Sequence, residues 1–428
     1  MNILVFGQAA WDDKNSAGNT FSNFFSGTAF SGDSFSNFYC REKCPDNKLN
    51  ITYYNLSASN IIKGILKLKV KGKEFISAEA EREFQKCSAD SKSEQDKINN
   101  LHKGKFEFVY FIHEIVWMSK IWLNRYFKAF VNRNKPDILF AFATSPYILW
   151  PLMKFLKKHT NCKVVLLIAD DVYGSYDRVA WFRRGYLKKL LSKCIVNADQ
   201  LYGISDEMSD LYKCIFKKNV TTLYKGCDLS EEPKRYVNDT VKFVYAGNLF
   251  WGRDDILSLL GKTIDKINKN GTKAELEIYT AANITPEIER KLNIQGSSSI
   301  MGARSYDEIK KIMHDADVVV HVESFDEQQM KTTQYSLSTK IIDCLQSGSQ
   351  IVGIGPSGIA SIEYLKRING VIVVDNKEKI EAAISSIVED KNSIIENSKK
   401  IRQYSETNHE ISIVQKKLRD DFALLCSR

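Results

Sequence analysis

The chain has 428 residues, of which 43% are hydrophobic and 26% are charged, so it is long enough for two soluble domains. Its formal net charge of +9 admits a nucleic acid, an anionic membrane or a phosphate-bearing ligand, but no RNA-binding motif is found, and we expect no nucleic-acid partner. No apolar run approaches the roughly 20 residues of a membrane span. The first residues lack the features of a secretory signal, and the nine cysteines form no CxxC pair, which predicts a reduced, cytoplasmic protein.

Apolar runs of strand length alternate with helical patterns along the whole chain. In the first half they lie at 2–7, 50–56, 137–143, 163–169, 200–205 and 220–226. In the second half they lie at 241–248, 274–280, 298–302, 317–323, 350–355 and 370–375. Apolar strands separated by helices are typical of parallel sheets with helices on both faces. The pattern predicts an α/β fold with two Rossmann-like doubly wound domains facing a central cleft, where ligands of such sheets bind.

The polar segment EEPKRYVNDT separates the two sets of strands, so we place the first domain at 1–232 and the second at 233–408. The remaining residues, 409–428, contain a helical pattern that would cross back to the first domain. Residues 64–105 are rich in charge and poor in aromatic residues, which predicts a mobile insertion without a fold of its own.

Two stretches, 111–135 and 181–193, combine basic with aromatic residues. A helix that lies on a membrane surface has this composition, and so has a helix with a core-facing aromatic side and a solvated basic side. The aromatic residues in question in the first stretch are Trp117, Trp122, Tyr126, Phe127 and Phe130.

The segment YSLSTKIIDCLQSGSQIVGIGPSG, residues 335–358, carries the main candidate for a binding site. It predicts a helix that begins with Ser338, Thr339 and Lys340, where free amides, the helix dipole and a lysine charge together favour phosphate. Asp343 falls on the same face one turn later and can accept hydrogen bonds from a ribose diol. Ser338 as an ordinary N-cap and Asp343 as a solvated surface acid fit the same residues.

The order DVVVHVESF, polar loop, STKIIDCLQSGSQIVGIG resembles the donor-nucleotide segment of the GT-B glycosyltransferases, in particular their large retaining family 4. YAGNLFWGRDDILSLL (245–260) resembles the glycine loop that opens the family's second domain, with Asn248 where Arg is usual and Arg253 where Lys is usual. NSAGNT (15–20) resembles the glycine-bearing loop after the first strand, and VVLLIADD (164–171) the strand whose end faces the acceptor. The resemblance covers nearly the whole chain and rests on element order.

The resemblance implies transfer of a sugar, with retention, from a nucleotide-diphosphate sugar, which we expect to be UDP-linked, to a glycan or lipid-linked acceptor. Arg253 and Lys340 would neutralise the leaving diphosphate, so neither a cofactor nor an essential metal is expected. Asp171 would orient or deprotonate the acceptor hydroxyl, although a helix N-cap fits it equally well. Donor contacts are expected from Gly18, Asn19, Gly247, Asn248, Gly302, Arg304, Glu323, Ser338, Thr339 and Asp343.

Other functions remain open at this stage. The family often has two glutamates separated by seven residues, and the position eight residues before Asp343 is Tyr335. The missing acid favours a non-catalytic GT-B partner or stabiliser of another glycosyltransferase. An epimerase would need clustered acids and a histidine, and an NAD enzyme would need GxGxxG, which FGQAAWDD lacks.

By family habit the acceptor belongs to a bacterial surface polysaccharide, and the basic-aromatic stretches would hold the first domain at the inner membrane face. His321 is expected to be a structural histidine and His113 a helix-surface residue.

Overall fold

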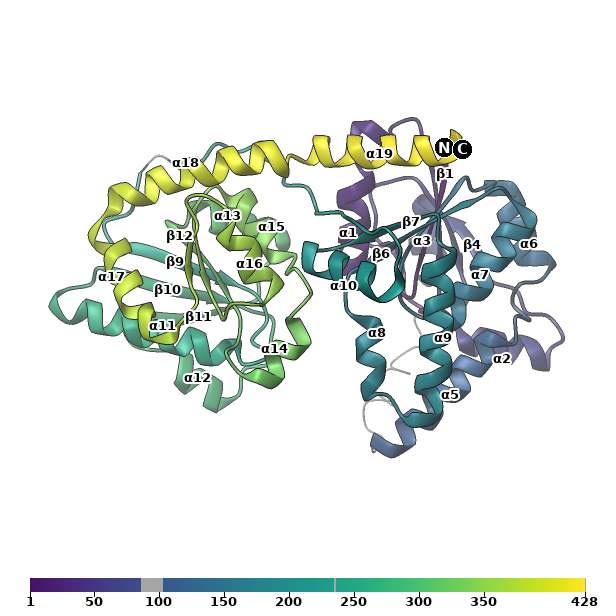
Figure 1. Ribbon diagram of the computed structural model, residues 1–428, viewed down its shortest axis with the longest axis horizontal. Helices are drawn as coiled ribbons and strands as arrows, with labels where there is room; N and C mark the ends of the chain where they lie inside the picture. Colours follow the sequence, from purple (N-terminus) through teal and green to yellow (C-terminus); the bar gives the residue numbers. More distant parts are fainter. Residues whose placement is uncertain (86–102, 235, 428) are drawn as a thin grey trace. The chain divides into compact units, whose positions relative to one another are not determined.

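The computed structural model describes residues 1–85, 103–234 and 236–427 (Figure 1). The chain divides into two compact units, which we treat separately. The first unit comprises Met1–Leu223 together with Gln415–Arg428, and the second unit is Tyr224–Val414. The C-terminal helix α19 (Ile411–Ser427) therefore belongs to the first unit over most of its length.

The first unit contains an eight-stranded sheet in the order β4-β3-β2-β1-β5-β6-β7-β8, in which all neighbours are parallel except β3 and β4. Its strands are β1 (Asn2–Gly7), β2 (Ser34–Tyr39), β3 (Ile51–Asn55), β4 (Lys73–Ile76), β5 (Ile138–Phe142), β6 (Lys163–Ile168), β7 (Gln200–Gly203) and β8 (Thr221–Thr222). Its helices are α1 (Ser16–Phe25), α2 (Ala58–Leu66), α3 (Ala80–Gln85), α5 (Lys103–Met118), α6 (Arg125–Asn134), α7 (Pro146–His159), α8 (Val172–Ser175), α9 (Trp181–Asn197) and α10 (Asp206–Phe216).

Helix α19 completes the core of this unit. The ring of Phe422 is fully buried and lies 6.1 to 6.3 Å from the rings of Phe25, Phe30 and Phe140. Gln415 donates a hydrogen bond to the carbonyl of Asn23 at 2.6 Å. The last helix of the chain thus closes over the helix and strands formed by the first residues.

Residues 64–105 differ from the prediction. The expectation that they lack a fold is wrong for 64–85, because β4 pairs antiparallel with β3 and Phe75 is buried against Tyr53, with ring centroids 5.3 Å apart. The strand was not predicted because the segment is highly charged. Lys73 and Glu74 of β4 are charged, and only Phe75 of this strand is buried. It is also wrong for 103–105, where α5 begins, and the rest of the expectation falls on 86–102, which lie outside the described residues.

The aromatic residues of 111–135 belong to the core. Trp117, Trp122, Phe127 and Phe130 are fully buried, and the Trp122 ring stacks on Phe38 at 5.3 Å. The membrane-surface interpretation of these four residues is therefore wrong, because side chains packed inside the domain cannot also enter a bilayer. The stretch forms two helices, α5 and α6, rather than one continuous amphipathic helix.

The basic stretch 181–193 forms most of α9, and its charges are partly paired inside the protein. Arg183 is buried and donates from Nε to Glu114 at 3.1 Å and from Nη1 to Glu107 at 2.6 Å, both on α5. These bonds fix α9 against α5, so Arg183 cannot serve a membrane surface.

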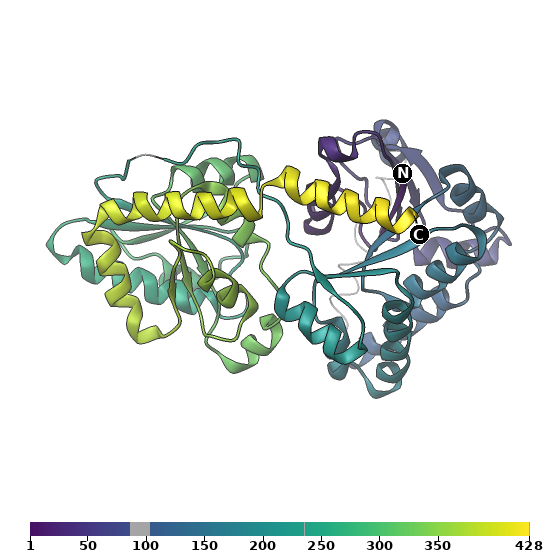
Figure 2. The same ribbon diagram turned by 45° about the horizontal axis from the view of Figure 1, so that its top comes forward.

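The second unit contains a six-stranded parallel sheet in the order β11-β10-β9-β12-β13-β14. Its strands are β9 (Val241–Ala246), β10 (Ala274–Tyr279), β11 (Ser298–Gly302), β12 (Val318–Val322), β13 (Gln350–Ile354) and β14 (Ile372–Val374). Its helices are α11 (Arg253–Ile267), α12 (Pro286–Leu292), α13 (Tyr306–Asp315), α14 (Glu327–Thr333), α15 (Lys340–Ser347), α16 (Ala360–Lys366), α17 (Ile380–Glu389) and α18 (Lys391–Asn408). Helix α18 contacts α15 and β13 and runs in front of the strands in Figure 2.

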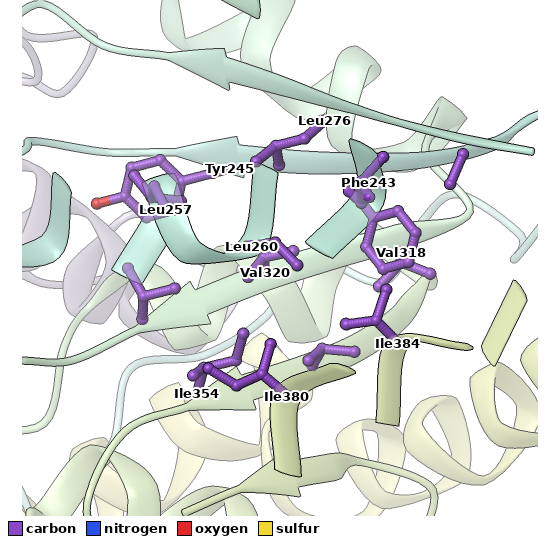
Figure 3. Close-up of a cluster of buried hydrophobic side chains, with 14 of the residues drawn as sticks. Phe243, Tyr245, Leu257, Leu260, Leu276, Val318, Val320, Ile354, Ile380 and Ile384 are labelled. Atoms are coloured by element: carbon purple, nitrogen blue, oxygen red, sulfur yellow. The ribbon is translucent and has the colours of Figure 1, made fainter. Parts of the chain in front are cut away.

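The core of the second unit lies between this sheet and the helices α11 and α17 (Figure 3). Leu257 and Leu260 of α11 and Ile380 and Ile384 of α17 cover buried side chains of four strands. The buried strand residues labelled in the figure are Phe243, Tyr245, Leu276, Val318, Val320 and Ile354. Burial of apolar surface on both faces of the sheet explains why all six strands of this unit are readable as apolar runs.

Candidate functional site

The carboxyl edge of the second sheet brings together residues that are far apart in the sequence. Gly247 and Asn248 follow β9, and Glu323 follows β12, the neighbour of β9. The chain leaves β9 toward β10 on one side and returns as β12 on the other, so these two strands form the switch point of the sheet, where ligands of open α/β sheets bind. Helix α11 begins here with Arg253, and α15 begins here with Lys340.

Arg253 and Glu323 form a buried ion pair at this switch point. Arg253 is 6% exposed and Glu323 is 2% exposed, and Nη2 of the arginine lies 3.1 Å from both carboxylate oxygens. The guanidinium also donates from Nε to the carbonyl of Val322 at 3.2 Å and from Nη1 to Oδ1 of Asn248 at 2.9 Å. Glu323, which the sequence placed against the donor sugar, is thus engaged in holding Arg253.

His321 adds a second contact to the Glu323 carboxylate. Its Nε2 lies 3.1 Å from Oε1 of Glu323, and the imidazole is buried, which agrees with the structural role expected for it. Burial raises the pKa of Glu323, but the hydrogen bond and charge of His321 and the charge of Arg253 outweigh it, so the pKa lies below its ordinary value. The carboxylate is therefore ionised wherever the protein is folded near neutral pH.

Lys340 presents a half-buried ammonium group beside this pair. Burial, followed by the positive charge of Arg253, lowers the pKa of Lys340 to about 8. Within residues 1–85, 103–234 and 236–427, no hydrogen bond or ion pair engages its Nζ. A Cβ on Gly247 would lie 2.7 Å from this Nζ and 2.7 Å from the Tyr245 hydroxyl, so Gly247 and the end of the lysine side chain are close neighbours. Among the described residues the amine thus has no direct ion pair at the switch point, and only the more distant charges of Glu323 and Asp343 attract it.

The start of α15 supplies further donors. Thr339 is the N-cap residue, and its side chain makes no capping hydrogen bond. The amide of Ser338 donates to the hydroxyl of Ser361 at 3.0 Å, which fixes the approach to the helix. The N-cap position thus belongs to Thr339 and not to Ser338, and the helix terminus presents polar groups next to Lys340.

Asp343 lies one turn along the same helix, in contact with a residue that the sequence analysis missed. The hydroxyl of Tyr306, the first residue of α13, lies 3.3 Å from Oδ1 of Asp343. Burial raises the pKa of Asp343, and the charge of Lys225, the Tyr306 hydrogen bond and Lys340 oppose that rise. Asp343 and Tyr306 line a pocket together with Lys310 on the α13 side. No local pattern marks Tyr306, because its contact with Asp343 depends on how α13 packs against α15.

Gly302 and Arg304 lie at the same edge, after β11. Gly302 has φ +75°, a conformation that favours glycine, and the Arg304 guanidinium lies 5.9 Å from the ring of Tyr279. In the sheet β11 is separated from β9 by β10, so these two residues stand two strands away from the Arg253–Glu323 pair.

The loop between β9 and α11 exposes two aromatic side chains that sequence analysis did not select. Phe250 and Trp251 are largely exposed, and Trp251 has φ +60°, which is unusual for a bulky residue. The Arg253 guanidinium lies 5.4 Å from the Trp251 ring. In the sequence, the signal for these residues was two adjacent aromatic residues in the turn between β9 and α11.

The remaining predicted residues belong to the first unit. Gly18 and Asn19 lie in the first turns of α1 rather than in a loop, and the Gly18 amide donates to Oδ1 of Asn15, the N-cap. A Cβ on Gly18 would lie 2.1 Å from the carbonyl oxygen of Asp12, so close packing explains this glycine. Asp171 is the N-cap of α8, where its Oδ1 accepts from the Gly174 amide at 2.9 Å.

No group of three His, Cys, Asp or Glu side chains among the described residues could hold a metal ion. Among the described helices we find none with the length and apolar character needed to cross a bilayer.

No protein-family model and no curated protein sequence matches the chain. Solved structures do match over its length. Sucrose-phosphate synthase from Thermosynechococcus elongatus is 11% identical with a TM-score of 0.64, and 99% of each chain is covered. HepE of Anabaena in complex with UDP is 9% identical with a TM-score of 0.63, covering 99% of this chain and 100% of the other. The trehalose-phosphate synthase (UDP-forming) of Burkholderia xenovorans in complex with glucose-6-phosphate is 7% identical with a TM-score of 0.59, covering 98% and 99%.

At these identities the likeness establishes the fold. Both units are Rossmann-like, with helices around a largely parallel sheet, and the matches extend over both of them. The fold class predicted from the sequence is thereby confirmed: the chain is an α/β protein of the GT-B fold.

Proposed function

We propose that the chain is a glycosyltransferase that transfers a sugar from a UDP-linked donor to a glycan or lipid-linked acceptor, with retention. The observation that carries this proposal is the half-buried Lys340 ammonium, which has no partner within the described residues at the switch point of the second sheet. A buried cation without a counter-ion is costly unless a ligand supplies the negative charge. A UDP-linked donor is supported by HepE, whose structure contains UDP, and by the UDP-forming synthase.

In this proposal the pyrophosphate lies between Lys340, Arg253 and the first turn of α15. The bond between the sugar carbon and the diphosphate oxygen breaks, and its electron pair stays on the departing UDP. Lys340 and Arg253 stabilise the charge that develops there, so no metal or cofactor is required. The acceptor hydroxyl oxygen bonds to the same sugar carbon, and its proton passes to an oxygen of the departing diphosphate. The Glu323 contacts keep the Arg253 guanidinium oriented throughout.

The other donor contacts are assigned by position. Asp343, one turn beyond Lys340, accepts hydrogen bonds from the ribose hydroxyls, and the backbone near Gly302 and Arg304 holds the base. Gly247 and Asn248 approach the diphosphate from β9. Family 4 membership and a surface-polysaccharide acceptor belong to the same proposal, and they rest on the order of elements in the sequence.

A binding experiment tests the proposal directly. Calorimetric titration with UDP, GDP and ADP and with a panel of their sugar conjugates should give one preferred nucleotide, and the preferred conjugate should be turned over when acceptors are supplied. The non-catalytic alternative, which Tyr335 suggests, predicts binding without turnover. Absence of binding by all three nucleotides would contradict the proposed donor site.

The low pKa of Lys340 predicts a pH dependence of UDP binding. Because this pKa is about 8, the amine is mostly protonated below that value and loses its charge as the pH rises through it. If only the protonated amine holds the diphosphate, the dissociation constant rises about tenfold between about pH 7 and about pH 9. Lys340→Arg, which keeps its charge over this range, should give a flat profile by the same calorimetry. A wild-type profile as flat as that of the variant would contradict a role for the amine.

Asp171 is proposed to orient the acceptor hydroxyl, and its capping contacts allow a clean test. Asp171→Asn retains an oxygen for the Gly174 amide and for the Tyr212 hydroxyl, so the melting temperature should stay within a degree or two of the wild type. Loss of the carboxylate should lower kcat/KM for the acceptor about 100-fold, with the affinity for UDP unchanged. Equal kcat/KM in the two proteins would leave Asp171 as a helix cap only.

A further inference from the structure

The turn that follows α2 exposes apolar side chains to an unusual degree. Leu66 is 81% exposed and Leu68 is 96% exposed, and of the other large hydrophobic residues in the described part of the chain only Trp181 reaches this range. Ile62 and Ile65 on the preceding turns of α2 are also exposed. Residues 62, 65 and 66 fall on one face of the helix, so the turn continues an apolar stripe.

This turn is held in place by the domain beneath it. Val70 is buried, its carbonyl accepts a hydrogen bond from Asn124 at 2.7 Å, and the amide of Gly72 donates to the hydroxyl of Tyr54 at 3.0 Å. Leu68 has φ +52°, a left-handed conformation that Gly or Asn adopts at lower cost. Leucine is disfavoured by the left-handed backbone conformation at position 68, and its side chain is not buried in the core. Its presence at this exposed position therefore requires another explanation.

Lysines alternate with these leucines. Lys63, Lys67, Lys69 and Lys71 are all exposed, and no acidic residue occurs from 57 to 73. The nearest acids along the chain are engaged elsewhere: Asp46 pairs with Lys14, and Glu74 pairs with Arg133. Glu42 accepts from the Ser57 hydroxyl at the far end of α2. The turn is therefore a positively charged apolar projection.

The neighbouring helix extends the apolar surface. Helix α5 contacts α2, and the two are drawn next to each other in the lower part of the first unit in Figure 1. Phe108, Ile112 and Ile115 of α5 are exposed, while its acids Glu107 and Glu114 pair with Arg183. No unpaired acid among the described residues of α5 offsets the lysines of the turn.

We propose that this surface, defined by residues 62–71 and termed the lysine–leucine turn, docks the protein on an anionic lipid bilayer. Leucines at the tip would enter the boundary between headgroups and acyl chains, while the lysines beside them extend to the lipid phosphates. A second copy of the chain is a poorer occupant, because two such turns would bring eight lysines together. The segment 86–102 is also a poor cover, since its only large aliphatic residues are Ile98 and Leu101.

This assignment differs from the membrane surface expected from the sequence. Four aromatic residues of 111–135, Trp117, Trp122, Phe127 and Phe130, are buried, whereas the turn lies in the segment that was expected to have no fold. It is independent of the proposed transferase activity, because all its residues lie on α2 and the turn of the first unit, whereas Lys340 lies in the second.

The test is flotation of the full chain with vesicles of phosphatidylcholine alone or with about 30 mol% phosphatidylglycerol. We expect binding to the anionic vesicles at about 0.1 M salt and its loss at about 0.5 M salt, because screening weakens the lysine contacts. The variant Leu66→Ser/Leu68→Ser should bind at least tenfold more weakly, and so should Lys63→Gln/Lys67→Gln/Lys69→Gln/Lys71→Gln. Both should keep the wild-type melting temperature and UDP affinity, since the altered side chains are exposed.

Matched controls come from exposed residues elsewhere. Ile215→Ser/Ile413→Ser removes two exposed aliphatic side chains, and Lys399→Gln/Lys400→Gln/Lys416→Gln/Lys417→Gln removes four lysines outside the turn. Both controls should bind vesicles like the wild type. Failure of the wild type to bind anionic vesicles would overturn the proposal, and so would equal losses in the test and control variants. Concentration-dependent dimerisation abolished by Leu66→Ser/Leu68→Ser would identify a second copy as the occupant instead.

Discussion

Lys340→Ala should weaken UDP binding about 100-fold and at the same time leave the protein as stable as the wild type or more stable. A charge-assisted contact to a diphosphate in a partly buried site contributes about 2–3 kcal/mol, which corresponds to this loss. The pKa of Lys340 is lowered in the folded state, which means that folding disfavours the charged amine. Alanine removes this unfavourable burial of charge. Calorimetry measures the affinity, and thermal melting of the ligand-free protein measures the stability.

The opposite signs of the two effects separate a binding role from damage to the fold. Lys262→Ala is the matched control, because this lysine is exposed on α11 of the same unit and should alter neither quantity. If Lys340→Ala retains wild-type affinity, the diphosphate lies elsewhere and the proposed donor site is wrong. If its melting temperature falls by several degrees, lost affinity would reflect misfolding, and Lys340→Met would have to replace it.

Glu323→Gln should lower the free energy of unfolding by about 3–5 kcal/mol, because it leaves the buried Arg253 guanidinium without its counter-charge. Glu381→Gln is the matched control, since it breaks a pair with Lys266 that is exposed on both sides and should cost less than about 1 kcal/mol. Urea denaturation followed by circular dichroism measures both. A cost for Glu323→Gln no larger than that of the control would contradict the importance of the buried pair.

The same pair predicts how stability depends on acid. The pKa of Glu323 is lowered by folding, so its contribution is present above the pKa of the unfolded chain and is lost as the pH falls through the folded value. The wild type should therefore lose stability below about pH 4.5, and Glu323→Gln should lack that part of the loss. Identical acid profiles would contradict an ionised Glu323 in the folded protein.

Much of the fold could be predicted because the strands are apolar and the helices between them are long. All six strands of the second unit were readable. Strands β12 and β13 are buried along their whole length, as expected for burial on both faces, whereas β10 alternates buried apolar with half-buried acidic residues. Strand β2, SFSNFY, was not predicted, because Asn37 and serines interrupt it. The structure accommodates Asn37 by hydrogen bonds to the backbone of Trp11 and Val5, which no local pattern reveals.

The contacts within the site were predictable only where both residues lie on the same helix or strand. Lys340 and Asp343 lie on one helix, and their spacing indicated a common face. The contact of Arg253 with Glu323 joins residues 70 positions apart, and it arises because β12 lies next to β9 in the sheet. From the sequence, Arg253 and Glu323 were each expected to contact the donor. In the structure they form an ion pair with each other.

Helix α19 has a consequence for the order in which the chain acquires its structure. Residues 224–414 form one uninterrupted unit, while the first unit needs residues 415–428 to bury Phe422 among the rings of its opening helix and strands. During synthesis the second unit can therefore fold completely before the first has its last helix. Until residues 415–427 have been synthesised, the phenylalanine cluster stays open to chaperones and to aggregation.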